Sequence, residues 1–278
     1  MSWLDLLLIP LGFAVGAYGT MVGAGGGFVL VPALLLIFPE ESQRTITAMS
    51  LLVVLANALS GTVAYARRKL IDYRSGLMFV SVAVPASFAG AYAVRFLPRS
   101  AFDMAFGVLV VTIAIVVVVG AARGSQTIRA PIRGGRAIIT RVIDRGDGVT
   151  SRYSYDVRPG LGLSGLTGFI ATLFGVGGGI IQVPMMTTVL RIPVDISVAT
   201  SQFMLIFMAS AGTLVHLSNG ELMGTELARA GLLSVGAIAG AQAGARISRR
   251  LSSATITRLL ALGLILIGAR LVLAPLFN

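Results

Sequence analysis

The sequence predicts an all-α polytopic membrane protein with two inverted five-helix repeats and a small cytoplasmic β-hairpin in the central linker. The first observation is composition, because 56% of the residues are hydrophobic and only 12% are charged, against about a quarter charged in a soluble domain. The second is a series of apolar runs, each near the ~20 residues that cross a bilayer as a helix. The third is a glycine-rich signature that occurs once in each half of the chain.

Seven long apolar runs lack the alternation typical of outer-membrane strands, and helices satisfy their own backbone groups in lipid. They cover residues 4–22, 45–66, 76–96, 101–122, 197–217, 225–247 and 255–275. The first run has no basic start, carries Asp5 and is followed by no small-residue cleavage site, so we interpret it as a permanent span rather than a signal peptide.

The glycine signature reveals an internal repeat. Residues 23–32 read GAGGGFVLVP and residues 175–184 read GVGGGIIQVP, which agree at six of ten positions at an offset of 152. Further matches at offsets of 151 and 150 pair Ala48, Ser50, Gly61, Thr62 and 89–91 with Ala199, Ser201, Gly212, Thr213 and 239–241. The repeat divides the chain into an N-terminal half (1–122), a linker (123–159) and a C-terminal half (160–278).

Each glycine segment precedes a helix that is too short to cross the membrane. Residues 28–38 and 180–190 each supply 11 residues, or about 16 Å of helix. We therefore expect each glycine segment to form the tip of a helical hairpin that ends inside the membrane, with both arms rooted on the same face.

The distribution of Lys and Arg predicts the orientation. In this arrangement the loops 67–75, 123–159, 191–195 and 246–258 share one face and carry 17 of the 22 basic residues. Cytoplasmic loops are enriched in Lys and Arg, so we expect this face to be cytoplasmic and both termini to be extracytoplasmic in the inner cell membrane. The same rule accounts for the net charge of +11 without nucleic-acid binding. The two halves are then inverted, as in secondary transporters.

The linker predicts a β-hairpin, because AIITRVIDRGDGVTSRYSYDV alternates with period two on both sides of residues 146–148. Its arginines are expected to face solvent or anionic headgroups, namely Arg129, Arg133, Arg136, Arg141 and Arg145. The hairpin is interpreted as a connector that sets topology, with a regulatory or partner-docking role as the alternative.

The glycine triplets are the candidate binding elements. A nucleotide loop is excluded because no Lys-Ser or Lys-Thr and no acidic ribose partner follow them. Helix packing explains the isolated Gly16, Gly61, Gly90, Gly212 and Gly240. Three consecutive glycines before a short helix instead expose backbone N–H groups at the positive end of a helix dipole, which suits an anion. The triplets are Gly25, Gly26, Gly27 and Gly177, Gly178, Gly179, and Pro32 and Pro184 reinforce the helix breaks.

Polar side chains inside spans are costly and tend to be functional. Hydroxyl and amide groups that could complete the anion site, or bond to their own helix backbone, are Ser50, Asn57, Gln182, Ser201 and Gln202. Thr47 and Thr200 belong to the same set. The sole histidine, His216, is either an ordinary interfacial residue or a proton-coupling group.

The sequence argues against an enzyme. Its acidic residues lie near span ends, and neither a Ser–His–acid cluster nor a metal-ligand pair is present. There are no cysteines, so disulfides and thiolate metal sites are excluded. We expect no catalytic residues, metal or cofactor. The expected partners are a small anion and the lipid bilayer, and no oligomeric state is predicted.

The paired glycine motifs, ATSQF at 199–203 and AGTLVHLSNGEL at 211–222 resemble the sulfite exporter TauE/SafE family, also called the four-toluene-sulfonate uptake permeases. The resemblance covers both repeats and implies an inner-membrane transporter of sulfite, sulfoacetate or related organosulfonates. The chain differs from the family at Gln182, where the second motif often carries His.

The leading hypothesis is a secondary transporter that exports a small sulfur-containing oxyanion by alternating access, one repeat rocking against the other. A passive anion channel with the same pore elements is the first alternative. The second is a membrane scaffold or sensor that acts through residues 123–159.

Overall fold

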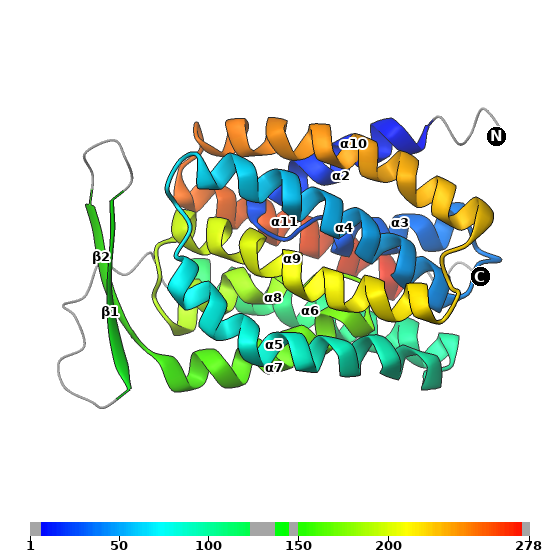
Figure 1. Ribbon diagram of the computed structural model, residues 1–278, viewed down its shortest axis with the longest axis horizontal. Helices are drawn as coiled ribbons and strands as arrows, with labels where there is room; N and C mark the ends of the chain where they lie inside the picture. Colours follow the sequence, from blue (N-terminus) through cyan, green and yellow to red (C-terminus); the bar gives the residue numbers. More distant parts are fainter. Residues whose placement is uncertain (1–6, 123–136, 145–149, 274–278) are drawn as a thin grey trace.

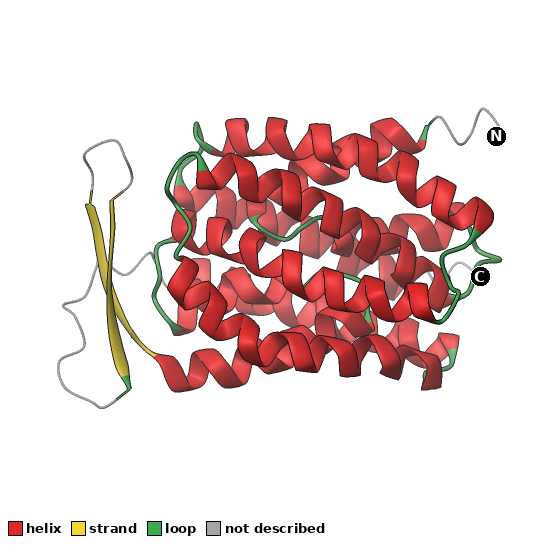
Figure 2. Ribbon diagram, in the orientation of Figure 1, coloured by secondary structure: helices red, strands yellow, loops and turns green. Residues whose placement is uncertain are grey.

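A computed structural model describes residues 7–122, 137–144 and 150–273. A bundle of roughly parallel and antiparallel helices carries two strands at one end (Figures 1 and 2). The first half contains α2 (Leu8–Val22), α3 (Gly27–Ile37), α4 (Gln43–Ala66), α5 (Tyr73–Ala93), the 3-10 turn Val94–Phe96 and α6 (Arg99–Ala122). The second half contains α7 (Val157–Leu173), α8 (Gly179–Pro184), α9 (Val194–Ser218), α10 (Gly224–Ser248) and α11 (Ser253–Leu273).

The predicted helical membrane protein is confirmed in its coarse features. Within the described residues, four helices are long and apolar enough to cross a membrane, at Gln43–Ala66, Tyr73–Phe96, Arg99–Val116 and Val194–Ser218. Helix α10 has the length of α9, 25 residues, but does not belong to this group. Part of the first predicted span, including Asp5, lies outside the described residues.

Side-chain caps mark where several helices begin. Ser42 accepts the Thr45 N–H at 3.2 Å before α4, and Asp72 accepts the Ser75 N–H at 3.1 Å before α5. Asp156 does the same for Arg158 at 3.0 Å before α7. Such caps satisfy N–H groups that lack an intrahelical acceptor. Helix α7 therefore starts at Val157, slightly inside the predicted linker of 123–159.

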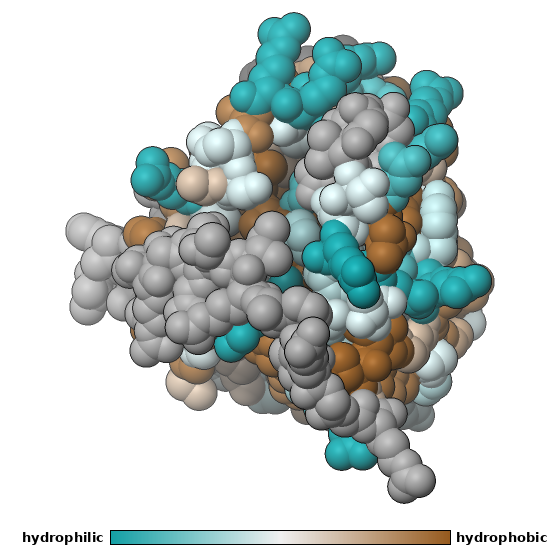
Figure 3. Space-filling model, turned by 90° about the vertical axis from the view of Figure 1, so that its left-hand side faces the viewer, coloured by the Kyte–Doolittle hydropathy of each residue, from teal (hydrophilic) through white to brown (hydrophobic). Residues whose placement is uncertain are grey.

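The connecting loops lie at two opposite ends of the bundle. Loops 67–72, 191–193 and 249–252 lie at the end that carries the strands, which we call the hairpin end (Figure 1). Loops 38–42 and 219–223 lie at the opposite end, called the distal end. Viewed from the hairpin end, hydrophilic side chains gather over the tips of the helices (Figure 3).

The two halves pack against each other along three pairs of helices, α2 with α10, α5 with α7 and α4 with α9. Glycines allow the close approach: a Cβ atom on Gly16 would lie 2.6 Å from the carbonyl oxygen of Ala237. One on Gly240 would lie 2.8 Å from the Ala17 nitrogen, and one on Gly90 would lie 2.9 Å from the Phe169 carbonyl carbon. The packing interpretation of these three glycines is confirmed.

The second short helix differs from the prediction. Residues 27–37 form a continuous α-helix in spite of Pro32, but the α-helix at Gly179 ends at Pro184 and a π-helix follows over Met185–Val189. Proline removes a backbone donor, and the wider turn is completed by Leu190 N–H bonding to Met185 O at 3.2 Å. The Thr188 hydroxyl also donates to Pro184 O, at 2.7 Å.

The predicted β-hairpin is confirmed as the antiparallel pair β1 (Ile138–Asp144) and β2 (Thr150–Asp156). Arg141 opposes Tyr153, and Ile139 opposes Tyr155. The expectation that Arg141 faces solvent is wrong, because period-two alternation places it on the docked face of the hairpin with these tyrosines. The other predicted members of the hairpin surface, Arg129, Arg133, Arg136, Arg145 and the turn 146–148, lie outside the described residues.

Candidate functional site

Both glycine segments are buried inside the bundle, where they form two turns. The first glycine turn is residues 23–26 and the second is residues 175–178. Gly25 and Gly26 have φ of 72° and 83°, and Gly177 and Gly178 have φ of 78° and 87°. These left-handed conformations are strained for residues with a side chain, which explains why the triplet occurs in both halves.

The two turns touch each other at the centre of the molecule. A Cβ atom on Gly27 would lie 2.7 Å from Gly175 O, and one on Gly179 would lie 2.5 Å from the Cα of Ala24. The backbone of each turn thus occupies the space that a side chain would need on the other. The structure therefore brings together both glycine triplets, from halves that are far apart in the sequence.

The helix starts at these turns carry amides without acceptors. In the described part of the chain, no backbone bond is formed by the N–H groups of Gly26, Gly27 and Phe28, or of Gly178, Gly179 and Ile180, and neither helix has a side-chain cap. Because helix N-termini concentrate positive potential, these N–H donors are the groups of the site that could bind an anion.

Ser50 and Ser201 hold the turns together by reciprocal bonds. The Ser50 hydroxyl donates to Gly175 O at 2.7 Å, and the Ser201 hydroxyl donates to Gly23 O at 2.9 Å. Each serine thus reaches across to the turn of the other half. Both serine hydroxyls donate their proton to a turn carbonyl. In this conformation the hydroxyl oxygens can therefore only accept further hydrogen bonds.

Asn57 bonds to the first turn itself, and Gln202 bonds to the α2 carbonyl of Gly19, which also accepts the Ala24 N–H of that turn. Asn57 Nδ2 donates to Gly25 O at 3.3 Å, and Gln202 Nε2 donates to Gly19 O at 3.3 Å. The Thr20 hydroxyl donates to Asn57 Oδ1 at 3.0 Å. Gln202 Oε1 is buried and has no partner among the described residues. The first turn is therefore surrounded by amide groups, one of which keeps a free polar atom.

Two apolar side chains close the space between the turns. A Cβ atom on Gly25 would lie 2.9 Å from Leu205 Cδ1 and 3.1 Å from Val54 Cγ1, and one on Gly177 would lie 2.5 Å from Val54 Cγ1. Val54 and Leu205 are related by the repeat offset of 151 and are 0% and 1% exposed. The side chains of Val54 and Leu205 thus contact both glycine turns.

Gln182 and His216 are placed away from this cluster of polar groups. Gln182 Nε2 contacts Ser164 Oγ and Met204 Sδ, each at 3.4 Å. His216 is fully buried near the distal end of α9, where its Nδ1 forms a hydrogen bond with the Glu221 carboxylate. Its Nε2 has no partner among the described residues. His216 is thus a buried group and differs from an ordinary interfacial histidine.

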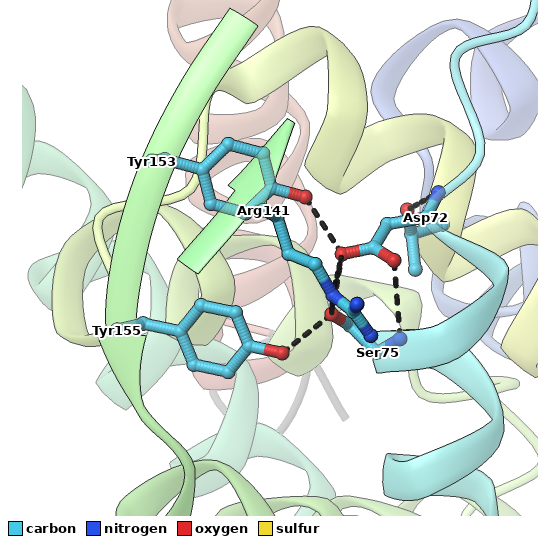
Figure 4. A network of polar contacts seen from close by, with 6 residues as sticks. Asp72, Ser75, Arg141, Tyr153 and Tyr155 are labelled. Atoms are coloured by element: carbon cyan, nitrogen blue, oxygen red, sulfur yellow. Dashed lines mark hydrogen bonds and ion pairs between the residues drawn. The ribbon is translucent and has the colours of Figure 1, made fainter. Parts of the chain in front are cut away.

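A second polar cluster, which the sequence analysis missed, docks the hairpin on the bundle (Figure 4). The Tyr153 hydroxyl donates to Asp72 Oδ2 at 2.7 Å, and the Tyr155 hydroxyl contacts the Ser75 hydroxyl. Arg141 Nε lies 3.6 Å from the same Asp72 oxygen. The spacing of Tyr153 and Tyr155 by two residues was the available signal, since it places both on one face of the strand.

The docked tyrosines remain neutral hydrogen-bond donors. Burial, followed by the charge of Asp72, raises the pKa of Tyr153, and burial also raises the pKa of Tyr155. The cluster is linked to α9, because the Asp72 N–H donates to the Thr200 hydroxyl at 3.0 Å. Thr200 directly precedes Ser201 and Gln202, so the hairpin is connected to the helix that carries both residues.

Metal binding has no support in the part of the chain that the structure describes, where no group of three or more His, Asp or Glu residues lies together. Polar chemistry at the turns therefore comes from backbone amides, hydroxyls and side-chain amides.

Comparison with known proteins gives a consistent result. The family model described as sulfite exporter TauE/SafE matches residues 8–271. "Probable membrane transporter protein YunE" of Bacillus subtilis is 31% identical over 279 residues, which cover 98% of this chain and 99% of the relative. "Probable membrane transporter protein MJ0441" of Methanocaldococcus jannaschii is 27% identical over 222 residues, or 77% and 74% of the two chains. No solved structure matches the chain.

Proposed function

Since the chain belongs to the sulfite exporter TauE/SafE family, and is therefore a membrane transporter and not an enzyme, we propose that it exports a small sulfur-containing oxyanion. Sulfite or an organosulfonate is the favoured substrate, and the mechanism is secondary transport by alternating access. The observation that carries this proposal is the meeting of two glycine turns whose helix-start amides lack acceptors in the described chain.

The amides of both turns would bind the anion without a buried Lys or Arg. Helix N-termini attract anions through exposed N–H groups and the helix dipole. The site would be completed by four polar side chains near the turns, namely Ser50, Asn57, Ser201 and Gln202. Their present hydrogen bonds to backbone carbonyls would have to be exchanged for bonds to the substrate. Gln182 and His216 would act outside this shell, His216 as the candidate for proton coupling.

The two halves would act as inverted repeats. The reciprocal bonds of Ser50 and Ser201 support this arrangement, as do the opposite directions of α4 and α9 in the bundle. The excess of Lys and Arg in the loops of the hairpin end supports a cytoplasmic location for that end under the positive-inside rule. Both termini would then be extracytoplasmic.

A carrier is favoured over an open channel because Val54 and Leu205 pack against both turns. In alternating access, one half would rock against the other and admit the anion from one face at a time. The apolar pair would separate on the open side and keep the other side closed.

A screen for thermal stabilisation of the purified protein by sulfite, thiosulfate, sulfate, sulfonates and carboxylates identifies the anions that bind. The test of the proposal is then the flux of these anions in proteoliposomes. Gly26→Val and Gly178→Val should abolish flux, because a Cβ atom would lie 2.7 Å from Val15 O and 2.6 Å from Met208 Cε, respectively, at positive φ. Gly162→Val is the matched control, since no atom lies within 4 Å of its Cβ position.

Both turn variants should still insert into the membrane. Unchanged flux in both would contradict the proposal. Accumulation against a gradient that collapses with the proton gradient is expected for a coupled carrier, whereas purely downhill flux would identify a passive channel.

A further inference from the structure

A small cavity lies at the hairpin end of the bundle, between α4, α9 and α10. Its volume is about 20 Å³, and its polar lining comes from Tyr65, Arg68, Asp195 and Ser248. A space of this size holds about one water molecule, so an anion could enter only if the helices separate. The cavity nevertheless combines a cation with hydroxyl groups at the edge of an apolar bundle.

Two groups of hydrogen bonds, which meet at the backbone and the side chain of Thr20, join this cavity to the first glycine turn. Arg68 Nη1 contacts Ser248 Oγ at 3.4 Å, and Ser248 Oγ lies 3.2 Å from the Tyr65 hydroxyl. The Tyr65 hydroxyl donates to Thr20 O at 2.9 Å. Thr20 and Asn57 then complete the connection to Gly25 O. We call these five side chains, Arg68, Ser248, Tyr65, Thr20 and Asn57, the polar file.

Four of the five side chains of the polar file are buried, and Arg68, at the hairpin end, is partly exposed. Tyr65 is 1% exposed, Thr20 and Asn57 are 0% exposed, and Ser248 is 7% exposed. Polar groups in a membrane interior are expensive and mark substrate pathways more often than lipid-facing surfaces. In this molecule they extend from the hairpin end as far as the proposed anion site.

The second half does not repeat this chemistry. At the repeat offset of 151, Asn57 corresponds to Met208, Tyr65 to His216 and Arg68 to Asn219. The residue that corresponds to Asn57 is therefore apolar, and no arginine stands at the corresponding position near the distal end. Fold symmetry alone does not account for the polar file, so it is a specific feature of one side.

We propose that the cavity is the entry site for the anion on the hairpin end, with Arg68 as the residue that first binds it. This inference rests on the proposed function. The planar guanidinium pairs N–H donors with two oxygens of an oxyanion. It lies 5.6 Å from the centre of the Tyr65 ring, which helps to orient it. The anion then passes along Tyr65, Thr20 and Asn57 to the first turn, while Asp195 weakens binding through charge repulsion.

The proposal is tested by measuring transport rates of the full chain in proteoliposomes in which the protein has one orientation, with the anion supplied to one end of the protein at a time. Arg68→Gln should raise the KM for sulfite or sulfoacetate presented to the hairpin end by about tenfold, the loss expected for one charge-assisted hydrogen bond. The KM measured from the distal end should stay within about twofold. Arg67→Gln is the matched control, because Arg67 is exposed on the same loop and carries the same charge.

Two further variants distinguish binding of the anion in the cavity from a general effect of surface charge on the KM. Asp195→Asn should lower the KM from the hairpin end several-fold, since it removes a negative charge from the same cavity. Tyr65→Phe keeps the ring beside Arg68 but removes the hydroxyl, so it should lower the maximal rate with little change in KM.

Equal KM shifts for Arg67→Gln and Arg68→Gln would overturn the entry site and leave the proposed function intact. Equal shifts from both ends would also overturn it, because Arg68 would then act through the fold. A wild-type protein that moves none of the anions would overturn the proposed function itself, and the entry site with it.

Discussion

The two glycine turns have nearly the same backbone but different surroundings. Each is held by a serine of the other half, at 2.7 Å for Ser50 and 2.9 Å for Ser201. Asn57 bonds to Gly25 O of the first turn and Gln202 to Gly19 O of the adjoining helix α2, whereas their repeat-related residues are Met208 and Leu51. The comparison teaches that the repeat preserves the backbone conformation of the glycine turns. The side-chain amide contacts of Asn57 and Gln202, by contrast, occur only near the first turn.

The largest expected effect comes from separating the turns. Gly27→Ala and Gly179→Ala each place a methyl group against the backbone of the opposite turn, and such overpacking costs about 1–3 kcal/mol or more. Thermal unfolding in detergent should show a lower Tm for both, together with loss of flux. Gly162→Ala has free space and should leave the Tm unchanged or raise it; a similar Tm for all three would show that the turns do not need their contact.

The next effect sharpens the difference between the turns. Asn57→Leu leaves Gly25 O and the Thr20 hydroxyl without a partner, which costs about 1–3 kcal/mol and should reduce anion flux by roughly tenfold or more. Met208→Leu, at the repeat-related position, conserves volume and should change flux by less than about twofold. Equal losses in initial-rate measurements would contradict the assignment of the polar contacts to the first turn.

The serine pair tests the symmetric part of the comparison. Ser50→Ala and Ser201→Ala each remove one bond between a helix of one half and the glycine turn of the other, worth about 1 kcal/mol, so the free energies of unfolding of the two variants should fall by similar amounts. Denaturant titration of both variants measures this. A loss that is several-fold larger for one serine would mean that the turns differ in stability as well as in polarity.

The smallest effect on transport is expected at the hairpin. Tyr153→Phe removes a donor to Asp72 and should increase hydrogen exchange over residues 138–144 and 150–156, with flux within about twofold of wild type. Ser154→Ala is the control, because Ser154 bonds to Thr140 on the opposite face.

Titration of the hairpin follows from the same contacts. The raised pKa of Tyr153 means that docking is fully stable below the ordinary tyrosine pKa of about 10. Docking weakens as the pH rises above about 10 towards the raised pKa, because over that interval only the undocked Tyr153 loses its proton. Hydrogen exchange in the hairpin that already increased between pH 7 and 9 would contradict this assignment.

Much of the architecture was predictable from local patterns. The helical membrane class, the first short helix, the hairpin strands and the glycine turns follow from apolar length, period-two alternation and consecutive glycines. The break at Pro184 was also visible, but its outcome was not, because Pro32 in the same position leaves α3 intact. The difference lies in the residues that follow, where Thr187 and Thr188 bond to carbonyls of the widened turn.

The sequence by itself determined the membrane class, the repeat and the positions of the two turns, because these depend on composition and on contacts between near neighbours. Only the tertiary structure decided that Ser50 and Ser201 bond across the halves, that Arg141 and Tyr153 meet Asp72, and that Tyr65 reaches Thr20. The physical reason is that hydrogen bonds join atoms brought together by packing of distant segments, so the chain order does not reveal which polar groups become partners.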